Sequence, residues 1–340
     1  MGKPKHLIIF RLSAMGDVAM LVPVLRCLYA QNQNIQITLV TPKRFVPIFK
    51  EFNELQIISP DFIGKHKGLK GLYRLYKELK QIKPNRIADI HHNLRTRILR
   101  LFFRLSFTRV KVIDKGYAER KRLTHPTKKT MKPLTPQLYR YVEVFSRLGF
   151  ALDLDKHEFP IKPGLPKSSL QIHLPADRKW IGIAPFAAHS GKIYPLDLMQ
   201  KVMGYLQQQH TVFLFGHGPK EADQIHVWAK AYPHVIPHAL EMPFADQLDL
   251  IANLDAMISM DSANGHLAAN FGVPVITLWG MTHPFLGFSA FGQNNHLLVD
   301  REKFPKVPTS AYGKTVPKGY RDAMRTITPE EVIEMVLEKI

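Results

Sequence analysis

The chain of 340 residues has almost no cysteine and no long apolar run, and each absence excludes a class of protein. Cys27 is the single cysteine, so an intramolecular disulfide is impossible and a reducing compartment is compatible with the composition. No segment approaches the roughly 18 uninterrupted apolar residues that a membrane-spanning helix needs. The first apolar run, Leu7 to Phe10, is too short for the core of a signal peptide. We therefore expect a cytoplasmic protein.

Acidic residues are scarce in the first half of the chain. Residues 1–150 hold 30 Lys or Arg against 9 Asp or Glu, a net charge of +21, whereas the rest of the chain, with 17 basic and 19 acidic residues, carries −2. This asymmetry indicates an anionic partner for the first half, which would be nucleic acid, an acidic membrane face or an anionic substrate. The alternative is a solvated basic surface that only maintains solubility.

Short apolar runs alternate with segments of helical spacing, which predicts a parallel sheet in each half of the chain. The predicted strands are 7–10, 35–40, 55–58, 86–90, 110–113, 180–184, 211–215, 234–236, 256–259 and 275–278. The predicted helices are 69–82, 94–105, 136–148, 195–208, 219–231, 244–253 and 264–271, with a terminal helix that Thr328 caps and Pro329 begins. The fold class is thus α/β, with two Rossmann-like domains.

The proline-rich composition from Asp153 to Asp177 is typical of an interdomain connection. We therefore place one domain at 1–160, a second at 161–325 and the C-terminal helix at 326–340. Within the first domain, Lys115 to Pro136 contains Lys, Arg, Thr and Pro with hardly an apolar residue, which predicts a mobile surface loop.

The stretch from Arg11 to Asp17 lies between the first predicted strand and an apolar, helix-length segment. In an open α/β sheet, a loop at the carboxyl end of a strand faces the ligand crevice, so Asp17 would expose its carboxylate there at a helix N-terminus. Such a carboxylate is a candidate general base. The alternative is that Asp17 only caps the following helix, since Asp is a favoured cap residue.

A second informative stretch, Met260 to Leu267, lies between a strand and a helix of the second half. Its small residues let the backbone approach a ligand, and the N–H groups of a first helical turn bind anions, so it predicts a phosphate cradle; plain helix capping is the alternative. It is not a Walker P-loop, because no Gly-Lys-Ser or Gly-Lys-Thr occurs. The turn at Gly216 fails the dinucleotide fingerprint, because Glu221 stands at its third glycine position.

Together these stretches resemble the heptosyltransferases of lipopolysaccharide core synthesis, glycosyltransferase family 9, over nearly the whole chain. Four segments carry the resemblance in the family's order and spacing. They are Ser13-Ala14-Met15-Gly16-Asp17-Val18 with Pro23, Lys192 with Tyr194-Pro195, Gly216 to Glu221, and Asp261 to Leu267 followed by Gly272-x-Pro274 and Gly280-x-Thr282-x-Pro284. Two positions depart from the pattern, since Ala263 stands where glycine is usual and Tyr194 where tryptophan is usual.

The resemblance implies the GT-B fold, in which two Rossmann-like domains with parallel sheets face a central cleft. It also implies an inverting, metal-independent transfer that needs no cofactor besides the nucleotide-sugar donor, expected to be ADP-heptose. Asp17 would be the catalytic base, and Lys192 would bind the donor phosphates. The other donor-site residues that it implies are the phosphate turn Asp261, Ser262, Ala263, Asn264 and Gly265, and the nucleotide-binding residues Gly216, Glu221, Met242 and Thr282.

The chemistry of the residues agrees with this scheme. An inverting transfer needs one base to take the proton of the acceptor hydroxyl while the bond from sugar to diphosphate breaks, and Asp17 can do this. Lys192 and the helix amides after Asp261 would stabilise the departing diphosphate. Asp153-Leu154-Asp155 matches the Asp-x-Asp element of metal-using glycosyltransferases, but it lies in the proline-rich connection, and we assign no metal ligand.

The basic first half would then bind an anionic glycolipid acceptor, lipopolysaccharide core or lipid A, in peripheral contact with the inner membrane face. The residues placed at the acceptor are Ser13, Met15, Gly16, Arg95, Arg97, Lys121 and Arg122. Three alternatives stay open. The protein would be a GT-B transferase for another nucleotide sugar or acceptor, or an epimerase or hydrolase of that fold, or a nucleic-acid-binding protein. Against the last, aromatic residues are not interleaved with the basic runs as stacking would require, so we expect no nucleic-acid partner.

Overall fold

The computed structural model describes residues 5–165, 177–237 and 241–340, which form two compact units. One unit consists of Met1–Lys115 and Gln137–Glu158, and the other of Gly116–Pro136 and Phe159–Ile340. The division after Glu158 lies two residues from the boundary that composition predicts. The segment Gly116–Pro136 differs from the prediction, because its contacts are with the second unit. Of the proline-rich connection, residues 166–176 lie outside the described part of the chain.

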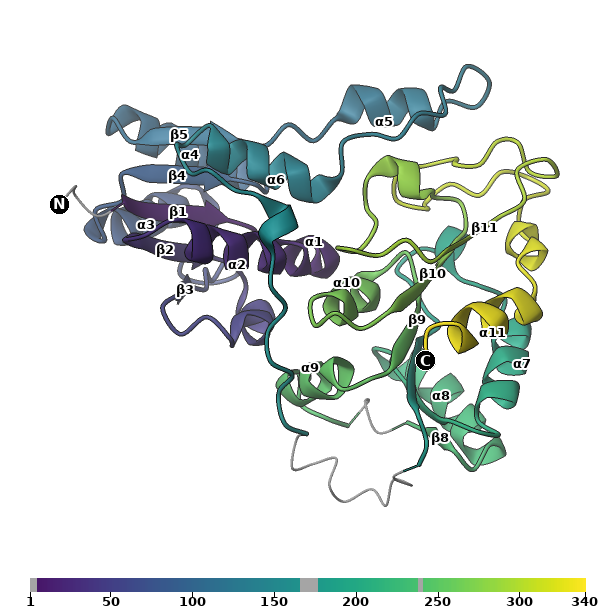
Figure 1. The fold of residues 1–340 in the computed structure, drawn as a ribbon. Helices are drawn as coiled ribbons and strands as arrows, with labels where there is room; N and C mark the ends of the chain where they lie inside the picture. Colours follow the sequence, from purple (N-terminus) through teal and green to yellow (C-terminus); the bar gives the residue numbers. More distant parts are fainter. Residues whose placement is uncertain (1–4, 166–176, 238–240) are drawn as a thin grey trace. The chain divides into compact units, whose positions relative to one another are not determined.

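The first unit is built on a five-stranded parallel sheet with the order β3-β2-β1-β4-β5 (Figure 1). Its strands are β1 (Lys5–Phe10), β2 (Ile35–Val40), β3 (Gln56–Ile58), β4 (Arg86–Asp89) and β5 (Arg109–Val112). All five lie within two residues of the predicted runs. In the central strand β1, residues 7–10 are fully buried, as expected when helices cover both faces of a parallel sheet.

Helices lie on both faces of this sheet (Figure 1). On one face, α3 (Gly68–Gln81) and α4 (Leu94–Leu105) bury Leu75 and Leu99 in a core with Ile8 and Phe10. On the other face, α2 (Leu21–Gln31) packs against α6 (Gln137–Ser146). The shorter helical segments of the unit are α1 (Met15–Ala19), η1 (Lys43–Phe49) and η2 (Leu154–Lys156).

The second unit contains a six-stranded parallel sheet with the order β11-β10-β9-β6-β7-β8 (Figure 1). Its strands are β6 (Trp180–Ala184), β7 (Thr211–Leu214), β8 (Val235–Ile236), β9 (Ala256–Met260), β10 (Val275–Trp279) and β11 (His296–Leu298). β9 is buried along its whole length between β6 and β10. The sequence did not predict β11, because a run of three residues shows no periodicity.

The helices of the second unit connect these strands and end the chain. They are α7 (Leu196–Leu206), α8 (Pro219–Ala231), α9 (Phe244–Ala252), α10 (Ala263–Ala269) and α11 (Pro329–Leu337), with the short η3 (Ser190–Lys192), η5 (Pro284–Leu286) and η6 (Ala323–Thr326). The predicted cap of α11 is confirmed, since Thr328 Oγ1 accepts the Glu331 N–H (3.2 Å) and Glu331 Oε2 accepts the Thr328 N–H (2.7 Å). Tyr194 is fully buried, and its hydroxyl donates to the Ile327 carbonyl (2.8 Å), which holds the segment before α11 to the core.

The surface loop predicted from Lys115 to Pro136 is wrong over its first part, which forms α5 (Tyr117–Leu123). Leu123 is fully buried, and the buried Arg120 lies over the ring of Phe288 at 4.3 Å, so one apolar and one cationic anchor fix the helix. Farther along, Lys129 donates to two backbone carbonyls, and the Leu134 N–H donates to that of Phe285 (2.9 Å). These contacts are all long-range, so local composition gives no sign of them.

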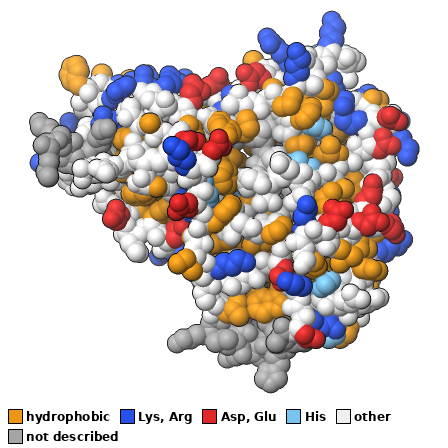
Figure 2. All heavy atoms as spheres, in the orientation of Figure 1, with side chains coloured by type: hydrophobic (Ala, Val, Ile, Leu, Met, Phe, Trp, Pro, Cys, Tyr) orange, Lys and Arg blue, Asp and Glu red, His pale blue; other side chains and the backbone are white. Residues whose placement is uncertain are grey.

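Charge is unevenly distributed over the second unit. The segment Gly116–Pro136 contains six Lys or Arg and one Glu. Figure 2 shows Lys and Arg side chains over this segment and Asp and Glu side chains around α11. The positive excess of the first half of the sequence is therefore divided between the first unit and this segment. In the described part of the chain, we find no helix with the length and apolar character needed to cross a membrane.

Histidines that are wholly or half buried make the fold sensitive to acid. Burial and, secondarily, the nearby Arg26 lower the pKa of His157 to about 4. Burial, with Arg301 as the next cause, lowers the pKa of His283 to about 4. An unfolded chain would protonate these side chains near pH 6.5, so the unfolded state binds more protons than the folded state between about pH 4 and 6.5.

We therefore expect the melting temperature to fall as the pH decreases from about 6.5 to 5, above the range in which most carboxylates titrate. The measurement is thermal unfolding by circular dichroism across this range. His157→Gln keeps an acceptor for Arg26, which lies 3.2 Å from His157 Nε2, and should flatten the pH dependence. His226→Gln, on the exposed side of α8, should leave it unchanged. A wild-type melting temperature that is constant over this range would contradict the prediction.

Candidate active site

Asp17 lies in the first turn of α1, directly after the loop that follows β1. Ala14 is the N-cap of this helix, and Asp17 takes part in capping from the third helical position, because its carboxylate accepts the Ala14 N–H. Its carboxylate forms an ion pair with Arg11 and contacts the Ala14 N–H at 3.4 Å. The Asp17 side chain is 28% exposed, whereas that of Arg11 is 4% exposed. The carboxylate is thus reached from solvent, while its counter-charge is inside the protein.

Three contacts fix the position of this pair. Arg11 Nη1 donates to the Ile90 carbonyl (2.5 Å) at the end of β4, and its guanidinium lies 5.6 Å from the centre of the Tyr141 ring. The Tyr141 hydroxyl donates to the backbone carbonyl of Asp17 (3.0 Å). Both ends of Asp17 are therefore held, which is the preorganisation that a general base needs.

His91, next to Ile90, adds a neutral group to this environment. Burial and, secondarily, the positive charges of Arg11 and Lys115 lower its pKa to about 4. His91 is therefore uncharged at neutral pH, so that Asp17 and Arg11 form a local ion pair without a third charge from this imidazole.

In the described ranges, no three His, Cys, Asp or Glu side chains come together as a metal site. Asp153 Oδ1 accepts the Asp155 N–H (3.1 Å), which caps η2.

The structure divides the residues predicted at the acceptor between the two units. Ser13, Met15 and Gly16 share the loop and first turn with Asp17. Arg95 and Arg97 lie exposed in the first turn of α4, which follows β4, the neighbour of β1 in the sheet. Their charges therefore lie at the same edge of the sheet as the Asp17 loop. Lys121 and Arg122, in contrast, are exposed on α5 of the second unit.

In the second unit, Lys192 and Asp261 form a close pair. Lys192 Nζ lies 2.7 Å from Asp261 Oδ2 and donates to the Asp261 backbone carbonyl (3.0 Å). The side chains are 15% and 5% exposed, so the carboxylate is the more deeply buried group. A carboxylate repels a phosphate, so Asp261 serves the predicted site by orienting Lys192, and the ammonium is the group that can meet an anion.

The predicted phosphate turn begins α10. Ser262 is its N-cap, and Ala263, Asn264 and Gly265 form its first turn. The fully buried Ser259, at the end of β9, accepts the Gly265 N–H (3.1 Å) and lies 3.2 Å from the Ser262 hydroxyl. This serine ties the turn to the strand. Ser259 was not predicted from the sequence, because a single serine at the end of an apolar run carries no distinctive signal.

The predicted nucleotide residues lie in neighbouring loops. Glu221 Oε2 accepts the His217 N–H (2.7 Å), and a Cβ on Gly216 would come within 2.8 Å of the Ile225 side chain, which would have to move. Met242, 6% exposed, precedes α9. Thr282 is buried after β10, and its hydroxyl has no hydrogen-bond partner among the described residues.

One edge of the second sheet brings these loops together. The residues of the predicted donor site all follow the carboxyl ends of β6 to β10, which are parallel, so they lie at the same edge. The loops of Lys192 and Thr282 also touch, since the Met281 N–H donates to the Gly191 carbonyl (2.7 Å). A Cβ on Gly280 would lie 2.3 Å from that carbonyl, so a residue with a side chain would not fit at this position. A cavity of about 410 Å³ opens beside the two loops, with Arg321 on its wall.

The two ion pairs have opposite polarity. The first unit buries a cation and presents a carboxylate, and the second buries a carboxylate and presents a cation. The more accessible member of each pair can therefore remove a proton, in the case of Asp17, or bind an anion, in the case of Lys192, which are the two functions that a group transfer from a diphosphate donor requires. Arg11 and Tyr141 had not been assigned from sequence, because their contacts depend on strand order and on α6.

Comparison with known proteins gives a consistent family assignment. The model of glycosyltransferase family 9 (heptosyltransferase) matches residues 74–314. The lipopolysaccharide core heptosyltransferase OpsX of Haemophilus influenzae is 24% identical over 289 residues, which cover 83% of this chain and 80% of that protein. The glycosyltransferase family 9 protein of Veillonella parvula has a similar structure, with a TM-score of 0.75 at 17% identity over 99% of both chains.

Escherichia coli heptosyltransferase WaaC, solved with ADP, gives a TM-score of 0.70 at 17% identity over 98% of this chain and 100% of that one. The two parallel-sheet units thus match the GT-B fold that the sequence predicted. Since the family model covers more than half of the chain, we conclude that it belongs to glycosyltransferase family 9, the heptosyltransferase family, and is a GT-B glycosyltransferase.

Proposed function

We propose that the protein transfers a heptose from ADP-heptose to an anionic lipopolysaccharide inner-core acceptor, with inversion at the anomeric carbon and without a metal ion. The observation that carries this proposal is the Asp17 carboxylate, which a buried Arg11 holds in place while it remains open to solvent. The relative OpsX is itself named as a lipopolysaccharide core heptosyltransferase, and WaaC was solved with ADP, which supports this choice of sugar, acceptor and nucleotide.

In the proposed reaction, Asp17 accepts the proton of the attacking acceptor hydroxyl. The oxygen forms a bond to the anomeric carbon as the bond from that carbon to the diphosphate oxygen breaks on the opposite face, and ADP leaves with the electron pair. Arg11 remains paired with the carboxylate throughout and balances its charge before the proton arrives. Tyr141 holds the backbone at Asp17, so the base does not have to reorganise during the reaction.

The departing ADP gains negative charge, which Lys192 and the first turn of α10 would stabilise. Lys192 meets the diphosphate with its ammonium while Asp261 holds that ammonium from behind. Glu221, at the start of α8, is suited to accept a hydrogen bond from the ribose hydroxyls, and Met242 to contact the base. Arg95 and Arg97 are exposed cations that would bind carboxylates or phosphates of the acceptor.

Asp17→Asn is expected to lower the transfer rate by about 10² to 10⁴, because an amide cannot take the hydroxyl proton. ADP binding, measured by isothermal titration calorimetry, should stay unchanged, since Asp17 belongs to the other unit. Asp223→Asn, an exposed change on α8, is the matched control. If Asp17→Asn retains the wild-type rate with the melting temperature preserved, Asp17 is not the base.

Lys192→Met should weaken ADP binding by about tenfold to a hundredfold, the value of a hydrogen bond to a charged group. The same change leaves Asp261 buried without its cation, so we also expect a lower melting temperature. Lys192→Met combined with Asp261→Asn removes the unpaired charge, and it should restore part of the stability but none of the affinity. Equal affinity in the wild type and both variants would exclude Lys192 from the donor site.

The donor, the metal requirement and the stereochemistry are tested with purified protein. Thermal shift should occur with ADP, and neither Mg²⁺ nor EDTA should change the shift or the transfer rate. NMR of the product should give an anomeric configuration opposite to that of the donor. A shift with UDP or GDP in place of ADP would replace the sugar and keep the chemistry. Loss of activity in EDTA would overturn metal independence, and saturable binding of nucleic acid at moderate salt would revive the nucleic-acid alternative.

A further inference from the structure

Helix α4 has two apolar faces, and only one of them is buried. Its inner face packs Leu99 and Phe103 into the core of the first unit. Residues 94, 98, 101 and 105 recur at helical spacing away from this inner face, with Ile98 half-buried against the same core. Of these, Leu94, Leu101 and Leu105 are 72%, 55% and 71% exposed. A surface helix of a soluble protein normally presents polar residues in these positions, so this stripe requires an explanation.

The apolar stripe continues beyond α4. The neighbouring α3 is joined to α4 by ring contacts, including Tyr73 with Phe102 (5.4 Å). Seven of the eight exposed large hydrophobic side chains in the described part of the first unit belong to these helices and the turns beside them. We call them the α3–α4 surface; they are Ile63, Leu69, Tyr73, Leu94, Leu101, Leu105 and Phe107.

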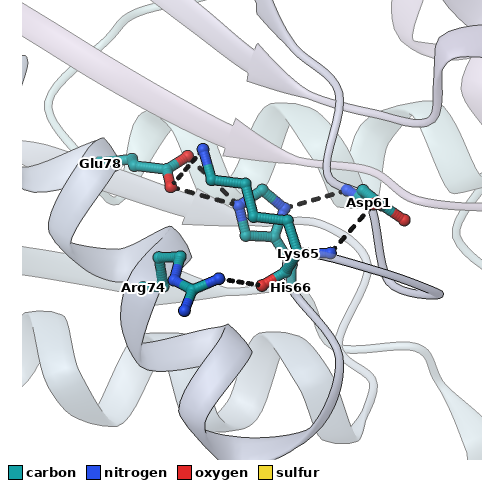
Figure 3. Close-up of polar contacts among 5 residues, drawn as sticks. All are labelled: Asp61, Lys65, His66, Arg74 and Glu78. Carbon is teal, nitrogen blue, oxygen red and sulfur yellow. Dashed lines mark hydrogen bonds and ion pairs between the residues drawn. The ribbon is translucent and has the colours of Figure 1, made fainter.

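The turn that carries Ile63 is firmly built. Asp61 accepts the N–H groups of Ile63 (3.1 Å) and Lys65 (3.0 Å) with its carboxylate. Its own N–H donates to His66 Nδ1 (3.0 Å), and Figure 3 shows the contacts of Asp61 with Lys65 and His66. His66 Nε2 donates in turn to Glu78 on α3 (3.2 Å). Ile63 is 89% exposed at this turn, so a fixed scaffold presents it to solvent.

The charges around the α3–α4 surface are almost all positive. Residues 61–107 contain twelve Lys or Arg and three Asp or Glu. Of the three carboxylates, Asp61 and Glu78 are used in the turn, and Asp89 is fully buried against Arg100 (3.0 Å). Helical spacing places Arg97 and Arg104 along one flank of the leucine stripe, on the side away from Phe102.

Lysines form the opposite flank. Lys70 and Lys77 are exposed on α3, and Lys77 Nζ lies 5.2 Å from the centre of the Tyr73 ring. The surface therefore consists of an apolar ridge between two rows of cations. Interfacial binding to an anionic bilayer uses this arrangement, because the apolar side chains enter the boundary of the acyl chains while Lys and Arg meet the phosphates. Lysine is depleted at protein interfaces, and leucine offers no ring on which a nucleobase could stack.

We propose that the α3–α4 surface docks the protein on an anionic phospholipid bilayer, with Leu101, Leu105 and Phe107 entering the headgroup region and the flanking Lys and Arg binding lipid phosphates. Membrane docking extends the proposed function and rests on it, since docking would bring the enzyme to a glycolipid acceptor that is presented at a membrane. Docking itself requires neither donor nor sugar transfer, so it can be measured separately.

Vesicle sedimentation tests the docking with the full-length protein. Wild type should sediment with vesicles that contain phosphatidylglycerol, at least about tenfold more tightly than with phosphatidylcholine alone, and binding should weaken as salt is raised. Leu101→Gln with Leu105→Gln should reduce the affinity by about tenfold or more. Val227→Gln with Leu337→Gln, on exposed faces of α8 and α11, should leave it unchanged.

A charge-reversal pair provides the second test. Lys77→Glu with Arg104→Glu should reduce binding to the anionic vesicles, while Lys201→Glu with Lys230→Glu, the same change in charge on α7 and α8, should have a much smaller effect.

Because the only cysteine, Cys27, is buried, Phe107→Cys can be labelled with an environment-sensitive fluorophore. Its emission should shift to the blue with anionic vesicles, and that of labelled Lys230→Cys should not.

The proposal is overturned if wild type does not bind the anionic vesicles, or if the α3–α4 variants and their controls bind equally. It is also overturned if ultracentrifugation shows a wild-type dimer that Leu101→Gln with Leu105→Gln dissociates, since a second copy would then cover the surface. With deacylated core oligosaccharide as acceptor, these leucine variants should retain wild-type kcat and KM and lose rate only on vesicle-borne acceptor. Absence of transfer by the wild type, with vesicle binding intact, would refute the proposed function alone.

Discussion

Parallel pairing of the strands is the constraint on which the candidate site residues of each unit depend. Parallel strands need crossover connections, so all carboxyl ends lie at one edge of a sheet and the loops after them meet there, whatever their separation in the sequence. The pairing of β1 with β4 brings Arg11 to the carbonyl of Ile90. The position of β9 between β6 and β10 brings Asp261 between the loops of Lys192 and Thr282.

The same device, an ion pair with one buried member, gives each unit a different chemistry. Burying a charge is costly unless it is paired, so the interior charge both fixes and requires its partner. Where the interior charge is Arg11, the exposed partner is the carboxylate of Asp17; where it is Asp261, the partner is the ammonium of Lys192. The polarity of the buried member therefore decides whether the accessible group is a base or an anion ligand.

The sequence was sufficient for elements whose pattern is local and insufficient for contacts that depend on topology. β2, α4 and α8 have the predicted bounds, because unbroken apolar runs or helical spacing define them. α5 was missed because its anchors lie on Phe288 and in a distant core. At the site, the positions of Asp17 and Lys192 after their strands followed from motif and pattern, and their roles stay predictions. The contacts that hold Arg11 beside Asp17 did not follow, since Arg11 and Ile90 are 79 residues apart.

Net charge and site chemistry have separate origins in this protein. Arg11, Arg100 and Lys192 each face a carboxylate, so they add nothing to the net charge of their surroundings. Most of the Lys and Arg side chains behind the excess of +21 in the first half of the chain are instead exposed. α4 contains both kinds, since Arg100 faces Asp89 inside while Arg104 lies outside beside the leucine stripe. Internal ion pairs thus hold the candidate reactive groups in place, while the exposed cations are free to attract anions outside the protein.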